Sequence, residues 1–233
     1  MSGVMTPWAL FDYTDMSGFR PFHLVINDKS TLDYGLRCTK FSIEAPKLKR
    51  HVVELKGANG QIDLSEVFSG RPMCSTRKLT AEFDVEDRHF SRWMQLSSEL
   101  LNWIHGKRAE ITASTDPDFY YEGRIAVTVA KKNKVYSTVK IDADCEPFKK
   151  QVNPDREEFT VSGSRLKNYF ADEMPAIPVI TCSAAMTVTF CGETYSLMQG
   201  ENRIYELVTS PGTNEYLFSG SGSVQFVCRG GRL

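Results

Sequence analysis

At 233 residues and 26.3 kDa, the chain is long enough for two modest domains or one large β domain. Its 28 basic residues nearly balance its 29 acidic ones, so nothing in the charge favours stable binding to nucleic acid. No segment approaches the roughly 18–20 consecutive apolar residues that cross a bilayer, which excludes membrane insertion by a helix.

The N-terminal segment lacks the apolar run of a secretory leader, because Asp12 and Asp15 interrupt it. We therefore expect a reducing cytosol as the place of synthesis. The six cysteines form no CxxC pair and no cluster with histidine. We expect free, buried thiols and neither a metal nor a cofactor.

Period-two alternation is the dominant pattern of the chain. Ile125, Val127 and Val129 occupy one face of a predicted strand, and a second alternating run follows a polar tetrad at residues 131–134. This pattern predicts a β-hairpin over residues 125–145.

One segment has a helical period instead. Its apolar residues recur at three- and four-residue spacing, which predicts a helix from Asp87 to His105 packed on a sheet. Asp87 is the expected cap of the first turn, and Gly106 the expected stop. The apolar stripe comprises Phe90, Trp93, Met94, Leu100, Leu101 and Ile104.

The charged stretch Phe148–Lys167 lacks a sustained apolar period, so a domain boundary is expected there. Short strands with glycine and proline between them follow and predict a β-sandwich. Their expected ranges are Met186–Phe190, Tyr195–Leu197, Ile204–Val208, Glu215–Phe218 and Val224–Cys228, with Gly220-Ser221-Gly222 read as a break.

Catalytic chemistry has one candidate group, the carboxylates of Asp116, Asp118 and Glu122, since paired acids perform glycoside hydrolysis. Asp-Pro-Asp is also a turn former, and this is the favoured interpretation. Phe119, Tyr120 and Tyr121, with Trp8 and Phe11, could stack on sugars, although core or interface packing is the commoner use of aromatic residues. The basic run at Lys47, Lys49, Arg50 and Lys56 is typical of a solvated strand edge.

Four segments in order resemble the N-terminal domain of the distal tail protein (Dit) family of phages with long non-contractile tails. The first, HLVINDKSTLDYGLRCTKF, contains Gly35. The second, GANGQIDLSEVFSGRPMCSTRKLTAEFDV, contains Gly60, Asp63, Gly70 and Arg77. The third, LLNWIHGK, contains Trp103 and Gly106, and the fourth, STDPDFYYEGRIAVTV, contains Asp116, Pro117, Tyr120 and Tyr121.

This resemblance implies a mainly β (α+β) protein of two domains. Residues 1–150 would form a split-barrel-like β domain with one packed helix, residues 1–22 being an N-terminal extension. Residues 151–233 would form a galectin-like β-sandwich.

The resemblance further implies a non-enzymatic structural protein, a homohexameric ring adaptor at the tip of the virion tail, assembled in the cytoplasm of the bacterial host. Its partners would be copies of itself, the tail tube protein and the tail-associated hub or lysin protein, and further receptor-binding proteins or host glycans. We expect the hairpin at 125–145 and the loop at 57–72 to make most ring contacts. A carbohydrate-binding module at residues 151–233 and a tail hydrolase using Asp118 are the competing interpretations.

Overall fold

We describe a computed structural model of the chain, which covers residues 21–57, 59–67 and 69–233. The chain divides into two compact units, one ending at Pro147 and one beginning at Phe148. The expected boundary at 150/151 lies three residues further along the chain. Trp8 and Phe11 lie outside the described residues, whereas Phe22, the last residue of the predicted extension, is buried and its ring lies 4.7 Å from that of Phe41.

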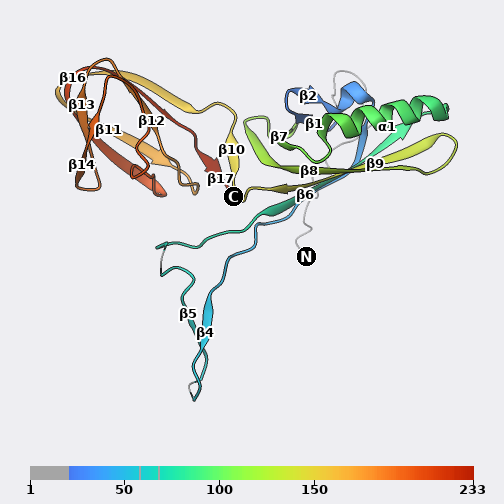
Figure 1. Cartoon of the computed structure of the whole chain (residues 1–233), viewed down its shortest axis with the longest axis horizontal. Helices are drawn as coiled ribbons and strands as arrows, with labels where there is room; N and C mark the ends of the chain where they lie inside the picture. The colour runs from blue at the N-terminus through green and yellow to red at the C-terminus, as the bar shows by residue number, and fades with distance from the viewer. Residues whose placement is uncertain (1–20, 58, 68) are drawn as a thin grey trace, which may run out of the picture. The chain divides into compact units, whose positions relative to one another are not determined.

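The first unit is built on an antiparallel sheet of seven strands in the order β2-β1-β7-β8-β9-β6-β3 (Figure 1). A 3-10 turn, η2 (Thr31–Tyr34), connects β2 to β3, and a separate pair, β4–β5, lies between β3 and β6 in the sequence. The strands of the sheet are β1 (Leu24–Ile26), β2 (Lys29–Ser30), β3 (Arg37–Ile43), β6 (Arg77–Glu86), β7 (Arg108–Ala113), β8 (Phe119–Lys131) and β9 (Tyr136–Cys145).

The predicted hairpin at 125–145 is confirmed as β8–β9. Val127 pairs with Ile141 and Val129 with Val139, so the apolar residues of both strands share one face. Asn133 closes the loop, because its side-chain oxygen accepts the amides of Val135 and Tyr136, each at 2.8 Å.

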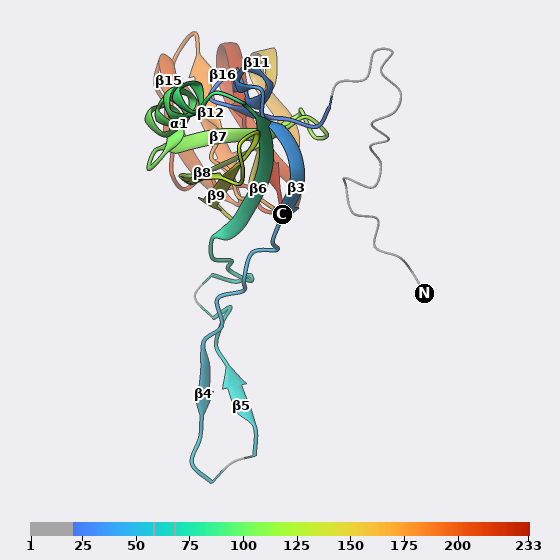
Figure 2. The same ribbon diagram turned by 90° about the vertical axis from the view of Figure 1, so that its right-hand side faces the viewer.

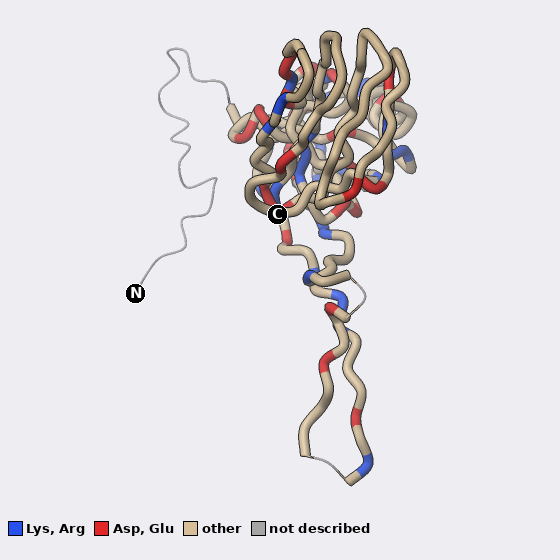
Figure 3. The backbone as a smooth tube through the Cα atoms, turned by 90° about the vertical axis from the view of Figure 1, so that its left-hand side faces the viewer, with Lys and Arg blue, Asp and Glu red and all other residues tan. Residues whose placement is uncertain are grey.

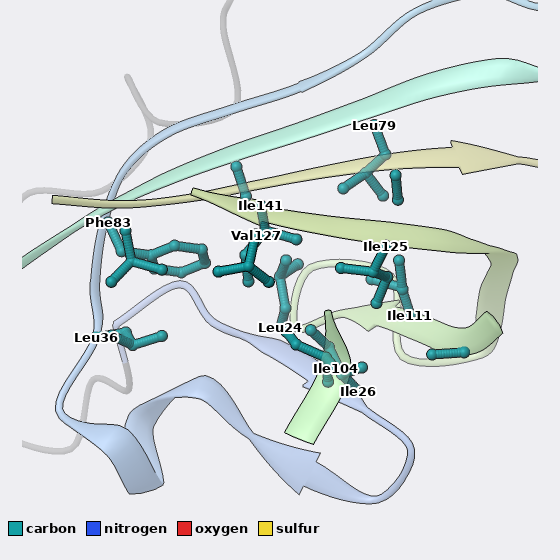
Figure 4. Packing of buried hydrophobic residues seen from close by; sticks show 14 of the residues in the cluster. Leu24, Ile26, Leu36, Leu79, Phe83, Ile104, Ile111, Ile125, Val127 and Ile141 are labelled. Atoms are coloured by element: carbon teal, nitrogen blue, oxygen red, sulfur yellow. The ribbon is translucent and has the colours of Figure 1, made fainter. Parts of the chain in front are cut away.

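The core of the first unit lies between this sheet and the helix α1 (Phe90–Ile104). Figure 4 shows Leu79, Phe83, Ile125 and Ile141 of the sheet pointing into the cluster that Ile104 joins from the helix. The helix face that is buried carries Trp93, Ser97, Leu100 and Ile104. The predicted stripe was therefore too wide, because Phe90 and Met94 are 64% and 50% exposed.

The helix begins later than predicted, and Asp87 does not cap it. The Asp87 carboxylate accepts the amide of His89 at 2.8 Å, and His89, the residue that precedes the helix, makes no capping hydrogen bond with its side chain. The predicted start was too early because the Asp87 carboxylate stabilises the turn before the helix and not the first turn of the helix. Gly106 ends the helix as expected, with a left-handed φ of 75°.

The second unit consists of antiparallel strands only. A long ribbon of β11 and β16 pairs from Asp155↔Cys228 to Ala171↔Gly212. On its other edge, β16 pairs with β13 near residues 217–219 and with β12 near residues 224–227. The strands are β10 (Lys149–Gln151), β11 (Asp155–Ala171), β12 (Val179–Cys182), β13 (Met186–Phe190), β14 (Glu193–Leu197), β15 (Gly200–Asn202), β16 (Gly212–Cys228) and β17 (Gly231–Arg232).

The ribbon contributes to two layers that face each other. The ring of Phe159, in the first half of β11, lies 5.3 Å from that of Phe218, in the first half of β16. The rings of Tyr169 and Phe226 likewise lie 5.7 Å apart across the core. Strands β11 to β16 therefore form a small β-sandwich from one continuous sheet, while β10 and β17 pair with each other outside it.

The domain boundary predicted in Phe148–Lys167 lies at the first residue of that stretch, where the second unit begins. Most of the stretch nevertheless belongs to β11, whose exposed polar residues pair with β16, so that its apolar period is weak. Two other predictions for the second unit were wrong. Residues 204–208 form a turn rather than a strand, since the Leu207 amide donates to the Ile204 carbonyl at 3.2 Å. Gly220-Ser221-Gly222 lies inside β16 instead of breaking it. The strand Met186–Phe190 is confirmed, and Tyr195–Leu197 lies within β14.

All six cysteines are free, and three of them are buried. Burial raises the pKa of the Cys145 thiol to about 12 and that of Cys228 to about 11, so both stay protonated and pack as apolar residues. Cys191 is exposed at the β13–β14 turn, where it has a φ of 50°. The expectation of burial therefore holds for Cys145, Cys182 and Cys228 only.

Candidate assembly arm

The most unusual element of the first unit is the segment between β3 and β6, residues 44–76, which we call the arm. It contains the two-stranded sheet of β4 (Val52–Glu54) and β5 (Gln61–Asp63), which lies away from the main sheet in both views (Figures 1 and 2). None of its described residues is buried. A segment of this length without buried residues cannot owe its conformation to a core of its own.

Local hydrogen bonds hold the arm in the form of a long hairpin. Near its root the Lys49 amide donates to the Met73 carbonyl at 2.7 Å, and the Ser75 amide donates to the Lys47 carbonyl at 2.8 Å. Further out, β4 and β5 pair from Val52↔Asp63 to Glu54↔Gln61. The pairing of β4 with β5 sets the direction of the arm, while residues 65–67 and 69–72 lie in a side loop outside this pairing.

Arg77, a residue from the family resemblance, joins the two ends of the arm at its root. It is 9% exposed, its Nε donates to the Glu44 carbonyl at 3.0 Å, and its Nη1 donates to the Pro147 carbonyl at 3.2 Å. Its guanidinium also lies over the Tyr121 ring, 5.3 Å from the centroid. A planar cation with several donors can make all of these contacts at once, which a lysine cannot.

Asp63 organises the outer part of the arm. Its carboxylate accepts the Ser65 amide at 2.9 Å, and the Ser65 hydroxyl accepts the His51 amide at 2.8 Å. Hydrogen bonds from Ser65 hold the pKa of Asp63 below its usual value, with a smaller contribution from Arg50, 3.9 Å away. Gly60 and Gly70 lie in turns of the arm, with φ of 90° and 65°. These residues shape the arm and do not form a pocket for chemistry.

Large apolar side chains lie exposed along the arm. Leu55, close to the tip, is 50% exposed, and Val67, in the side loop, is 63% exposed. Monomeric proteins rarely leave so many apolar groups on one projecting element, and such surfaces mark sites of protein interaction. The full set is Leu48, Val52, Leu55, Ile62, Val67 and Met73, each between 38% and 63% exposed.

Charges of both signs are interspersed with these apolar residues (Figure 3). The predicted basic run of Lys47, Lys49, Arg50 and Lys56 lies wholly in the arm and is exposed, and Glu54, Asp63 and Glu66 lie near it. The arm therefore presents both apolar and charged side chains to solvent.

The remaining residues from the family resemblance lie in the body of the first unit. Gly35 ends η2 with a φ of 67°, and Trp103 stacks on Tyr34 with ring centroids 4.7 Å apart. Tyr120 and Tyr121 are buried, at 6% and 8% exposure. They pack in the fold and do not offer faces for sugars.

The candidate carboxylates do not form a catalytic group. Asp116 and Pro117 lie in a turn that the Phe119 amide closes by donating to the Asp116 carbonyl at 3.3 Å. Glu122 lies in β8 and forms an ion pair with Arg108, which also binds Glu146. The turn interpretation of Asp-Pro-Asp is therefore confirmed.

The comparisons with known proteins give a match in structure only. No protein family model matches the sequence, and no curated protein matches it either. A solved structure that matches is that of the phage protein SPP1 Dit (gp 19.1), described as a paradigm of the hub adsorption apparatus in phages infecting Gram-positive bacteria. The two share 14% identity with a TM-score of 0.67 over 92% of this chain and 100% of that one.

The chain has a Dit-like fold. The mainly β class predicted from the sequence is confirmed with it. A conserved Pseudomonas aeruginosa PAO1 protein of unknown function, PA5104, also aligns over 89% of this chain and 98% of its own, with 9% identity. Its TM-score of 0.27 is too low to indicate a shared fold. In the part of the chain that the structure describes, no helix has the length and apolarity to cross a membrane.

Proposed function

We propose that the chain is a structural component of a phage tail, a homohexameric ring adaptor that links the tail tube to the tail-tip hub and host-recognition proteins. The observation that carries this proposal is the arm, which exposes six large apolar side chains and has no buried residue of its own among those described. The Dit-like fold supports the same role, since the similar phage protein belongs to an adsorption hub.

The arm provides one half of the contact that a ring requires. A cyclic assembly joins one surface of each protomer to a different surface of the next. Burying a Leu, Ile or Val side chain contributes about 1.5–3 kcal/mol, so burial of a few arm residues on a neighbour supplies the free energy of a stable contact. Because the arm projects from the first unit of one copy, it can contact the next copy without a conformational change in the main sheet of either copy.

The edge of the main sheet is the second surface. Among the strands of the described residues, the order ends at β3, a seven-residue strand that pairs with β6 and has no described strand on its outer edge. Backbone groups at such an edge bind an added strand readily. The arm and the β3 edge are different surfaces of one unit, as closed head-to-tail assembly demands. The hairpin β8–β9 completes the predicted contact region.

The arm's role can be tested by size-exclusion chromatography with light scattering on the full chain and on the double variant Leu55→Asp, Ile62→Asp. We expect the natural chain to have six times the mass of one 26.3 kDa protomer and the variant to be a monomer. The matched control is Met198→Asp, which places the same charge at a residue 70% exposed in the second unit and should leave the hexamer intact. A hexamer that survives the double substitution would show that the arm does not hold the ring.

A further inference from the structure

The tip of the arm carries the only asparagine–glycine pair of the 233-residue sequence, Asn59-Gly60. The pair lies just beyond Glu54↔Gln61, the outermost described pair of the β4–β5 sheet. Asn59 is exposed, and its side chain makes no hydrogen bond to the described residues. Neither burial nor a hydrogen bond to the described residues therefore holds its side-chain amide away from the backbone that follows it.

The backbone at Gly60 leaves this approach open. Gly60 has a φ of 90°, and apart from its chain neighbours no described atom lies within 4 Å of the place that a Cβ would occupy. Its amide makes no hydrogen bond to the described residues. Because glycine has no side chain, other groups can come close to its backbone. The Gly60 amide nitrogen is therefore accessible to the side-chain carbonyl carbon of Asn59.

We infer that Asn59 is a site of spontaneous deamidation. The Gly60 amide nitrogen attacks the Asn59 side-chain carbonyl carbon, and a new C–N bond closes a succinimide ring. The bond from that carbon to the side-chain nitrogen breaks, and this nitrogen leaves as ammonia with the proton of the Gly60 amide. Water then opens one of the two ring carbonyls and leaves aspartate or isoaspartate at position 59. The net change exchanges ammonia for water and needs no oxidant or reductant.

Other asparagines of the chain lack this combination of features. Asn102 is exposed, but it lies in α1, where the amide of Trp103 bonds to a carbonyl one turn earlier. The side-chain oxygen of Asn133 accepts two backbone amides, and a lysine follows it in the sequence. Both residues should keep their side-chain amides under conditions that convert Asn59, so they serve as controls within the same molecule.

Deamidation changes the arm at the end that carries Leu55, and this consequence rests on the proposed function. The reaction adds a negative charge to the tip, and isoaspartate also lengthens the backbone between β4 and β5 by one methylene. Burying an unpaired charge costs free energy that an amide does not cost. Deamidation before assembly therefore weakens the contact of the arm with the next copy.

The test of the site is peptide mapping by mass spectrometry of the full chain during incubation in mildly alkaline buffer. We expect the peptide with Asn59 to gain the mass difference between an amide and an acid, while Asn102 and Asn133 stay unchanged. Gly60→Ala should slow the conversion roughly tenfold, because a side chain then hinders the attacking nitrogen. An unchanged Asn59, or equal conversion at all three asparagines, would overturn the inference.

The consequence for assembly is tested by light scattering on Asn59→Asp, which carries the charge of the product, and on Asn59→Gln, which keeps an amide. We expect the Asn59→Asp hexamer to dissociate at a roughly tenfold higher concentration than the Asn59→Gln hexamer. Equal assembly of the two variants would overturn the effect on the ring. A natural chain that is monomeric at every concentration would instead contradict the proposed function, and the peptide map would be unaffected.

Discussion

At the scale of single residues, the stability of the arm's root depends on Arg77. Replacement by lysine keeps the charge but loses the planar donor group that binds the carbonyls of Glu44 and Pro147 and covers Tyr121. We expect Arg77→Lys to lower the free energy of unfolding by about 1–3 kcal/mol, measured by urea denaturation.

The matched control for this substitution is Arg50→Lys. The Arg50 side chain is 68% exposed and its one ion pair, with Asp63, spans 3.9 Å. An exposed pair of this kind contributes about 0–1 kcal/mol, so this variant should unfold close to the natural chain. Equal stability of both variants would mean that Arg77 does not anchor the arm.

Residue patterns predicted the body of the first unit well and the arm poorly. The alternation around Val127 and Val139 was sufficient to predict the hairpin because the strand faces that carry these residues are buried. Leu55 and Ile62 follow no such rule, since both side chains are exposed and no buried face fixes their positions. One pattern in the sequence could have indicated an exposed arm. Apolar residues alternate there with lysines and glutamates, in a segment between two clearly predicted strands.

At the scale of elements, the ribbon β11–β16 determines the second unit, and Gly220 allows β16 to run close to the start of the neighbouring strand β13. Gly220 has a φ of 145°, and a Cβ added there would lie 2.7 Å from the Cβ of Met186. We expect Gly220→Ala to lower the free energy of unfolding by about 1–3 kcal/mol in the same urea assay.

Ser221→Ala, in the next position of the same strand, is the control for Gly220→Ala. Ser221 is exposed, so its substitution should change stability by less than about 0.5 kcal/mol. If Gly220→Ala is no less stable than Ser221→Ala, the close approach of Met186 in β13 is not a constraint on this position.

The sequence could not distinguish these glycines from a turn. Gly-Ser-Gly is a frequent break between strands, and only the partner strand reveals that Gly220 and Gly222 face Met186 and Ser183. The first half of β11 was missed for a related reason: its edge position exposes Glu157 and Glu158, so only Phe159 and Val161 show the buried alternation there. Both the glycines of β16 and the first half of β11 owe their conformation to pairing with strands distant in the sequence, which a local pattern does not show.

At the scale of the whole molecule, the proposed function depends on the first unit, whose arm and β3 edge would provide the two different surfaces that a closed ring joins. The formal net charge of −1 gives the chain no excess of basic residues that would favour nucleic acid as a partner.

The ring itself is the central claim, and negative-stain electron microscopy of the purified full chain tests it most directly. The proposed function predicts class averages that show closed rings of six copies around an open centre. Single compact particles at every concentration, in the same preparation that folds and remains soluble, would contradict it.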